Sequence, residues 1–326
     1  MQSLRIPILV LAAFLLLMTV SSCRRKADDD VTPTTPATDS PTLQETNTSS
    51  DESTVSAETD DATSAVDDYL NSNTTTLLRQ GAPANPYNFA AWNCGGNVAV
   101  DASLAAQRQY TFTYTNSVCN DRTRNGKIIF KLTRDTNWTN PGAVLRITWD
   151  NFSVSRLVNG ATRTIVINGY HDVTNVNGGR VIQATATRTI IHKVRGNMLV
   201  GLDGGGYRSW RVYRKRSYTS GNNGLTVTIA GDTTIGTKAN IDVIGANRYD
   251  NQFISMIDVP IVSNAQCGFW KPVQGKKIHE INLRNIVVTF GLNASGTPVT
   301  AGNCATHYRV KAGTTNSLAY DLLLAY

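Results

Sequence analysis

The amino-acid sequence predicts an all-β protein: an antiparallel meander that forms an elongated sandwich or a strongly curled sheet, preceded by a disordered tether. Apolar and polar residues alternate with a period of two from about Gly81 onward, as in half-buried strands. Asn-Gly pairs recur between these runs, and no convincing amphipathic helix interrupts them. Because parallel strands need long crossover connections, which are usually helical, a helix-free succession of strands predicts an antiparallel sheet.

The alternation identifies individual strands. In Lys127–Leu132 the even-numbered positions are apolar and most odd-numbered ones are polar, and the same period runs through Leu145–Trp149. Further strands are expected at Thr162–Ile167, Val181–Ile191, Leu225–Ile229, Phe253–Val259 and Ile281–Phe290. Since asparagine and glycine tolerate positive φ, tight hairpins or bulged loops are expected at Asn125-Gly126, Asn159-Gly160, Asn168-Gly169, Asn177-Gly178 and Asn223-Gly224.

The charged residues divide the chain into three segments. Residues 1–26 contain four basic residues and no acidic one, whereas residues 27–78 contain twelve acidic residues and no Lys or Arg. Of the 31 basic and 24 acidic residues of the chain, 27 and 12 lie in residues 79–326, which therefore carry a net charge of +15. We expect a signal segment at 1–22, a tether at 23–78 and a basic β domain at 79–326. A hydrophobic content of 41% with 17% charged residues excludes collagen-like, coiled-coil and multi-span membrane classes.

Residues 1–22 have the organisation of a secretory signal peptide. Arg5 precedes an apolar stretch from Ile6 to about Val20, which is too short for a comfortable transmembrane helix. The stretch ends in Val20-Ser21-Ser22-Cys23, which resembles the lipobox of bacterial lipoproteins. The resemblance implies cleavage before Cys23 and acylation of its thiol, and two or more acyl chains anchor a protein stably in a membrane. An ordinary secreted protein is the alternative.

The residues after this cysteine form a basic cluster followed at once by an acidic one. Arg24, Arg25 and Lys26 precede Asp28, Asp29 and Asp30. The arrangement resembles the surface-export signal of Bacteroidetes lipoproteins, and it implies an outer-membrane protein that faces the cell exterior. The other interpretation is the solvated beginning of an acidic linker.

The acidic segment from Ala27 to about Leu78 consists mainly of Thr, Ser, Asp and Pro. Such a composition buries too little apolar surface to offset the entropy of ordering the chain. We therefore expect a disordered spacer that lifts the β domain off the membrane, with at most one weak helical turn near Val66, Tyr69 and Leu70.

Four further cysteines lie in the basic domain. An even number of cysteines in an exported domain predicts disulfides, and four cysteines allow three pairings. Proximity along the chain favours Cys94–Cys119 and Cys267–Cys304.

No motif for catalysis or for a metal is evident. The four histidines are scattered, and neither a zinc-ligand spacing nor a zincin motif is present. Gly201–Gly206 is rich in glycine, but no Gly-Lys-Ser/Thr follows, so it is interpreted as a hairpin connection. The aspartates of residues 79–326 are spread singly, and glycoside hydrolysis usually needs two facing carboxylates. We therefore expect no metal, no cofactor and no enzyme. The alternative is a secreted-type hydrolase whose aspartates converge in the fold.

The densest chemical feature is the basic and aromatic segment Arg208–Tyr218. Guanidinium groups beside aromatic rings bind sulfated, phosphorylated or carboxylated glycans by charge and stacking. Charge on both faces of a strand also suits an exposed edge strand that resists aggregation. On a strand, one face carries Arg208, Trp210, Arg214, Arg216 and Tyr218, and the other carries Arg211, Tyr213 and Lys215.

The later part of the domain, with Cys267-Gly268-Phe269-Trp270 and the run Gly275–Phe290, resembles a group of uncharacterised Bacteroidetes lipoproteins. The resemblance implies no particular activity. The leading functional hypothesis is a lipid-anchored surface protein that binds an anionic polysaccharide or lipopolysaccharide without enzymatic activity, nucleic acid being a less natural partner there. A purely structural envelope component is the third interpretation.

Overall fold

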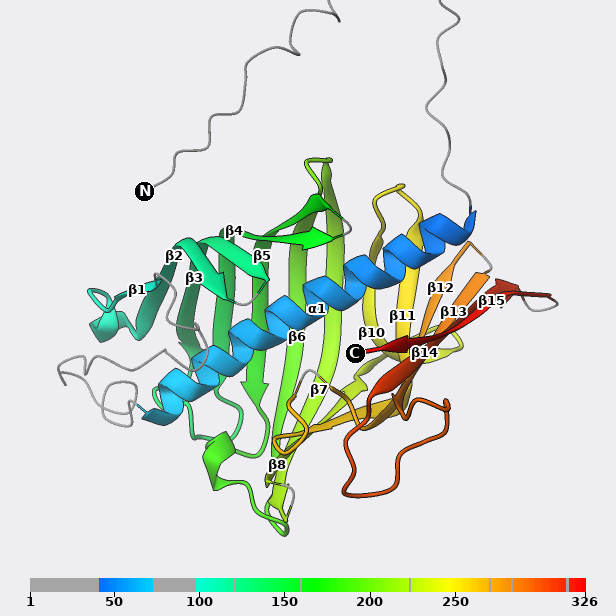
Figure 1. Ribbon diagram of the computed structural model, residues 1–326. Coiled ribbons are helices and arrows are strands. Elements are labelled where there is room, and N and C mark those ends of the chain that lie inside the picture. The colour runs from blue at the N-terminus through cyan, green and yellow to red at the C-terminus, as the bar shows by residue number, and fades with distance from the viewer. Residues whose placement is uncertain are drawn as a thin grey trace, which may run out of the picture. The chain divides into compact units, whose positions relative to one another are not determined.

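The computed structural model describes residues 41–72, 98–119, 121–158, 160–222, 224–269, 271–282, 284–314 and 317–326. Within them, fifteen strands form a single antiparallel sheet, and one long helix lies across the face of that sheet (Figure 1). The predicted antiparallel meander is therefore confirmed, in the form of one curled sheet.

The elements follow one another as they do in the sequence. The helix is α1 (Pro41–Ser72), and two short 3-10 helices are η1 (Ala105–Gln107) and η2 (Val181–Gln183). The first half of the sheet contains β1 (Val98–Asp101), β2 (Gln109–Cys119), β3 (Arg122–Arg134), β4 (Val144–Val158), β5 (Ala161–Asn175), β6 (Ile190–Leu202) and β7 (Tyr207–Gly221). The second half contains β8 (Gly224–Gly231), β9 (Thr233–Ile235), β10 (Lys238–Ala246), β11 (Gln252–Asn264), β12 (Gln274–Ile281), β13 (Arg284–Leu292), β14 (His307–Thr314) and β15 (Ser317–Ala325).

The sheet is a meander with one branch. Strands β1 to β7 pair in sequence order, β10 follows β7, and β10 to β15 again pair in order. Strand β8 pairs with both β7 and β11, and β9 pairs with β10. The ends of the sheet are therefore β1 and β15. Along the main path of the sheet, each strand between these two has a neighbour on both sides.

Two Asn-Gly pairs lie inside strands instead of at turns. Gly126 in β3 and Gly169 in β5 have positive φ values of 96° and 111°. The pairing register shifts beside each of them, as in a β-bulge. A Cβ atom at Gly126 would lie 2.2 Å from the Asn151 carbonyl oxygen, and one at Gly169 would lie 2.3 Å from that of Asn197. These glycines therefore permit bulges, which increase the local twist of a sheet.

One predicted strand is shorter than expected. The run Val181–Ile191 begins with η2 and continues as a loop, and strand β6 starts only at Ile190. Val181 and Ile190 instead pack together in a small cluster with Tyr218. The apolar residues of this run therefore belong mostly to a loop that packs against the sheet, and only the last two lie in a strand.

The helix α1 corrects the expectation of a disordered spacer for residues 41–72; residues 27–40 and 73–78 lie outside the described residues. The helix contains eight acidic residues and no basic one, and it belongs to the same compact unit as the strands. The compact unit therefore extends back well before residue 79. Contacts with the sheet stabilise the helix, since Val55, Ala62, Ala65, Val66, Tyr69 and Leu70 are all buried in the main hydrophobic core.

An aromatic cluster holds the C-terminal part of α1 against the sheet. The ring centroid of Tyr69 lies 5.3 Å from that of Tyr110, 5.7 Å from that of Phe112 and 5.4 Å from that of Phe130. These three partners belong to β2 and β3, and their tilted or edge-on contacts are favourable arrangements for aromatic rings. The helix is thus part of the core of the sheet.

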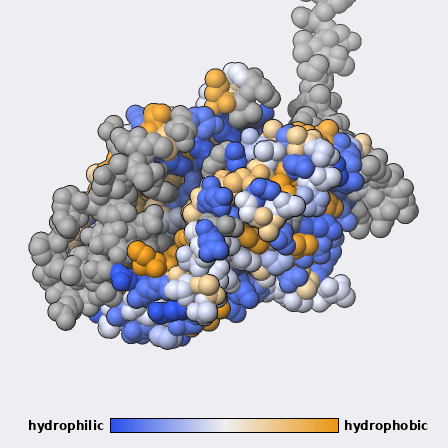
Figure 2. Space-filling view, turned by 60° about the horizontal axis from the view of Figure 1, so that its bottom comes forward, coloured by the Kyte–Doolittle hydropathy of each residue, from blue (hydrophilic) through white to orange (hydrophobic). Residues whose placement is uncertain are grey.

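The disulfide Cys267–Cys304 confirms one predicted pair. Cys119 is also disulfide-bonded, and its predicted partner Cys94 lies outside the described residues. On the surface shown in Figure 2, hydrophilic residues predominate and hydrophobic ones lie in scattered groups. Within the residues described, no helix combines the length and apolar composition that a membrane span requires.

Candidate functional site

Strand β7 carries the predicted polyanion-binding segment, and the structure separates its two faces. The side chains of Arg214 and Arg216 are only 4% exposed, on the inner face. Trp210 is buried on the same face, where its indole N–H donates to the Ala246 carbonyl oxygen at 2.8 Å. Arg208 is half-buried and pairs with Asp250 at 2.6 Å. Arg214 and Arg216 bind Asp60 of α1, and Trp210 is buried, so these three side chains contact the protein itself and are not accessible to an external polymer in this structure.

The edge-strand interpretation of the same segment is wrong. β7 pairs with β6 along Tyr207–Tyr218, and on its other side it pairs with β10 and β8. A strand with neighbours on both sides exposes no free edge, so its charges have another cause. On the inner face, that cause is the acidic helix α1.

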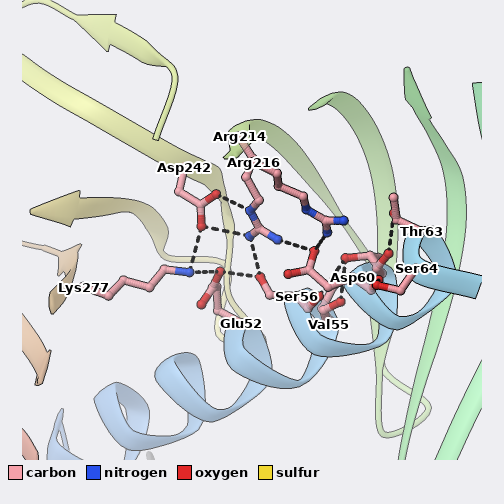
Figure 3. A network of polar contacts seen from close by, with 11 residues as sticks. Glu52, Val55, Ser56, Asp60, Thr63, Ser64, Arg214, Arg216, Asp242 and Lys277 are labelled. Carbon is pink, nitrogen blue, oxygen red and sulfur yellow. Dashed lines mark hydrogen bonds and ion pairs between the residues drawn. The ribbon is translucent and has the colours of Figure 1, made fainter. Parts of the chain in front are cut away.

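A buried ionic network joins α1 to the sheet (Figure 3). Arg214 binds Asp242 through Nε at 2.7 Å and Nη2 at 2.9 Å. Its Nη1 donates to Asp60 of α1 at 2.5 Å. The ammonium group of Lys277 donates to Asp242 at 2.8 Å and to Glu52 of α1 at 2.6 Å. Because every charge in this network has partners of opposite sign, the interior can contain it.

The electrostatics of the network keep its members ionised. Burial by itself would raise the pKa of Asp242, but Arg214 and Lys277 outweigh burial and hold that pKa well below its usual range. Burial likewise opposes ionisation of Glu52, yet Lys277 and the neighbouring His279 lower its pKa. For Lys277, burial is outweighed by Asp242 and Glu52, and the pKa is raised. Protonation of either carboxylate would therefore break the pairing.

The same kind of pairing runs along the whole helix. Glu45 binds Arg284 at 2.9 Å, Asp51 binds Arg248 at 2.6 Å, and Glu58 binds Arg124 at 3.0 Å. These cations come from β13, the β10–β11 connection and β3. The inner face of the sheet is thus a basic surface that the acidic helix of the same chain already occupies.

The outer face of β7 remains accessible and continues across four neighbouring strands. Arg211, Tyr213 and Lys215 lie opposite Asn197, Arg195 and Lys193 of β6. Arg195 lies opposite Asp172 of β5, which lies opposite Arg146 of β4, which lies opposite Lys131 of β3. We call this set the basic outer face: Lys131, Arg146, Tyr170, Lys193, Arg195, Arg211, Tyr213 and Lys215.

Aromatic rings and guanidinium groups stack on the basic outer face. The guanidinium carbon of Arg146 lies 4.1 Å from the ring centroid of Tyr170, and that of Arg195 lies 5.4 Å from the ring of Tyr213. The side chains of Arg146 and Arg195 are 43% and 42% exposed, although each also binds a carboxylate. Cation–π stacking holds the planar guanidinium groups in place while one surface of each group stays open to solvent.

Positive charge exceeds negative charge on the basic outer face. Its six cations face two carboxylates, Asp172, which binds Arg146, and Asp232, which binds Lys193 and Arg195. Lys131, Arg211 and Lys215 form no ion pair within the part of the chain that the structure describes. These three side chains therefore provide charge that an external anion can reach.

A cavity of about 360 Å³ lies between α1 and the ends of β3, β4 and β5. Asp51 of α1 and Asp203 of the β6–β7 turn both line it, and Arg248 binds both, at 2.6 and 2.8 Å. Burial raises the pKa of Asp51, whereas for Asp203 the hydrogen bonds from the Thr164 N–H, Arg248 and Arg163 outweigh burial and lower the pKa. The fold therefore brings two carboxylates of different environment into one cavity, which the sequence did not indicate.

Three of the four histidines are buried on the inner side of the sheet. Burial, followed by the charges of Arg214 and Arg216, lowers the pKa of His171 well below its ordinary value. Burial lowers the pKa of His192 to about 3 and that of His279 to about 4. All three are therefore neutral at pH 7. Among the described residues, no group of three or more His, Cys, Asp or Glu side chains is placed to hold a metal ion.

The predicted anchoring residues lie outside the described residues: Cys23, Arg24, Arg25, Lys26, Asp28, Asp29 and Asp30. The sequence prediction also missed five residues of the basic outer face: Lys131, Arg146, Tyr170, Lys193 and Arg195. These residues occupy the polar positions of alternating strands, which was the available signal. A single segment of sequence, however, does not show which strands pair with β7 and so bring these residues together.

In comparisons with known proteins, no protein-family description, no curated protein and no solved structure matches this chain.

Proposed function

We propose that this protein binds an extended anionic polymer, such as an acidic polysaccharide or lipopolysaccharide, on the basic outer face. The observation that carries the proposal is the unbroken row formed by Lys131, Arg146, Arg195 and Tyr213 with Asp172, which crosses β3 to β7. Four strand spacings of 4.7–4.9 Å make this row about 19 Å long. That length suits several units of a chain rather than a single small anion.

The chemistry of the face supports a glycan in particular. Aromatic rings pack against the apolar faces of sugars, while guanidinium groups bind carboxylate or sulfate groups with paired hydrogen bonds. Both are present here because Tyr170 and Tyr213 lie beside Arg146 and Arg195. A binding role also suits exposed charges, which attract polymers over about 8 Å at physiological salt.

We propose further that the protein is lipid-anchored through Cys23 and faces the exterior of an outer membrane. The lipobox-like ending of residues 1–22 and the clusters at residues 24–30 support this location. A Cys23→Ala variant should leave the membrane fraction or accumulate as precursor. Normal processing and full membrane retention of that variant would overturn the anchoring proposal.

The test of polymer binding compares two double variants that remove the same charge. Arg211→Gln/Lys215→Gln should weaken heparin binding about fivefold to tenfold at low salt, since each exposed charge contact contributes roughly 0.5–0.7 kcal/mol. Lys276→Gln/Lys311→Gln, on β12 and β14, is the matched control and should leave the affinity within about twofold. Equal weakening by both variants would show that net charge alone attracts the polymer and would overturn the site.

Hydrolysis of an acidic glycan is the second candidate, favoured by one observation. Asp51 and Asp203 line the same cavity, and their pKa values shift in opposite directions, as an acid–base pair requires. Against this candidate, Arg248 binds both oxygens of Asp51, which leaves that carboxylate little freedom to transfer a proton. Release of reducing ends from a polyuronate, abolished by Asp203→Asn, would establish the hydrolase; no release by the unaltered protein would eliminate it.

A further inference from the structure

Three arginines that line this cavity form a row across the strands. Arg156 of β4 lies directly opposite Arg122 of β3 on one side and Arg163 of β5 on the other. Side chains in directly opposite positions have Cβ atoms about 4.5–5.5 Å apart, and like charges in such positions destabilise a sheet. We call these three residues the arginine row, and its stability requires anions nearby.

The chain supplies anions to the two outer members of the row only. Arg122 binds Glu58 of α1 at 2.5 Å, and Arg163 binds Asp203 at 2.7 Å. Arg156, in the middle, donates to the Thr54 hydroxyl at 3.3 Å and has no carboxylate partner among the residues that the structure describes. Arg248, which also lines the cavity, binds Asp51 and Asp203, so the cavity contains one cation without a carboxylate partner beside three that are paired.

The rest of the cavity wall combines these ion-paired groups with hydroxyl groups and with an apolar surface that exceeds the polar one. Ser50 and Thr54 of α1 bring hydroxyl groups, and Val154 and Ile165 of β4 and β5 contribute apolar surface. A volume of about 360 Å³ is at the lower end of the range for small-molecule sites. Hydroxyl groups, an apolar surface and a guanidinium group without a carboxylate partner are the complement of a sugar ring, which has an apolar face, hydroxyl groups and one carboxylate.

We propose that this cavity binds a single acidic sugar, and that Arg156 binds its carboxylate. A guanidinium group binds a carboxylate with two parallel hydrogen bonds, which fixes the orientation of the sugar ring. The nearby Asp51, Glu58 and Asp203 repel ligands of higher negative charge, so a monoanion is favoured over a multiply charged anion. The cavity lies on the helix side of the sheet, so this site does not depend on polymer binding at the basic outer face.

Calorimetric titration of the full chain with glucuronate, glucose and acetate tests the site. Glucuronate should bind at least tenfold more tightly than either control, because only glucuronate has both the ring and the charge. Arg156→Gln should weaken glucuronate binding tenfold or more. Arg156→Lys, which keeps the charge but loses the paired geometry, should give a smaller loss. Lys276→Gln removes the same charge on β12, outside both proposed sites, and should stay within twofold of the unaltered protein.

A loss of glucuronate binding in Arg156→Gln should not result from misfolding. Arg156 has no ion pair to lose, so the variant should keep the melting temperature of the unaltered protein. Absence of glucuronate binding, equal binding of glucose, or equal affinity in Arg156→Gln and Lys276→Gln would each overturn the proposal. Loss of heparin binding in Arg211→Gln/Lys215→Gln with glucuronate binding intact would show that the two sites are separate.

Discussion

At the scale of single residues, the charges on the inner face depend on one another, so that removing any one of them would lower the stability of the fold. Asp242 is fully buried and accepts hydrogen bonds from both Arg214 and Lys277. Two cations of different strands thus depend on one carboxylate, and Glu52 and Asp60 of α1 complete their pairing. Such a cluster makes the docking of the helix specific, since a shift of one residue along the helix would separate these partners.

Asp242→Asn should therefore destabilise the protein strongly. The variant leaves Arg214 and Lys277 buried with less negative charge, and breaking a buried pair in this way costs about 3–5 kcal/mol. Asp258→Asn is the control, because Asp258 is 47% exposed and pairs with Lys276 at 3.0 Å on the surface. Urea denaturation should show a loss below about 1 kcal/mol for the control. Equal losses in both variants would contradict the network.

Buried histidines should make the folded state sensitive to mild acid. The pKa of His279 is lowered to about 4 by burial, whereas an unfolded histidine has a pKa near 6.5. Protons therefore bind the unfolded chain first, so stability is complete above about pH 6.5 and falls as the pH falls towards 4. At pH 4, the lowered pKa of His279 reduces the free energy of unfolding by an amount on the order of 3 kcal/mol relative to neutral pH.

Thermal denaturation between pH 7 and pH 4.5 measures this effect. The melting temperature should fall with pH, and His279→Gln should make the fall shallower, because His192 and His171 still contribute. The acidic network adds its own loss only at lower pH, since Asp242 and Glu52 have lowered pKa values in the folded state. An identical slope with and without His279 would contradict the assignment.

At the scale of elements, α1 is the unexpected part of the structure. Its first half has few large apolar residues, and its apolar contacts gather between Val55 and Leu70. The partners that order the first half are Arg248, Lys277 and Arg284, about two hundred residues away in the sequence. Local composition indicates disorder in such a segment, and only the folded sheet reveals the complementary charges.

The strands were more predictable, because their signal is local. Alternation in Lys127–Leu132 and Leu145–Trp149 follows directly from one buried and one open sheet face, and both runs lie inside strands. The division of Arg208–Tyr218 into two faces was also predicted correctly. The sequence did not indicate which of the two faces contacts solvent. That choice depends on the helix, whose position no pattern within β7 encodes.

A pair of aspartate substitutions distinguishes an integral helix from a spacer. Val66→Asp places an unpaired charge at a position that is fully buried among the core residues, and it should cost more than about 3 kcal/mol. Ser53→Asp adds the same charge on the exposed side of the same helix and should cost less than about 0.5 kcal/mol. Similar melting temperatures for the two variants would show that α1 does not belong to the core.

At the scale of the whole molecule, the sheet has two basic faces that differ in how their charge is balanced. The inner one is neutralised by the acidic helix of the same chain, and the outer one keeps an excess of positive charge. An external polymer is therefore expected to bind without displacing α1.

Hydroxyl-radical footprinting with and without heparin tests this division of roles most directly, since it reports the solvent exposure of individual aromatic side chains. Tyr170 and Tyr213 of the basic outer face should be modified in the free protein and protected when heparin is added. Trp210 and Tyr69 should stay unmodified in both states, because α1 remains docked on the inner face. Modification of Trp210 or Tyr69 on addition of heparin, with Tyr170 and Tyr213 unchanged, would show that the polymer displaces the helix and would contradict the account.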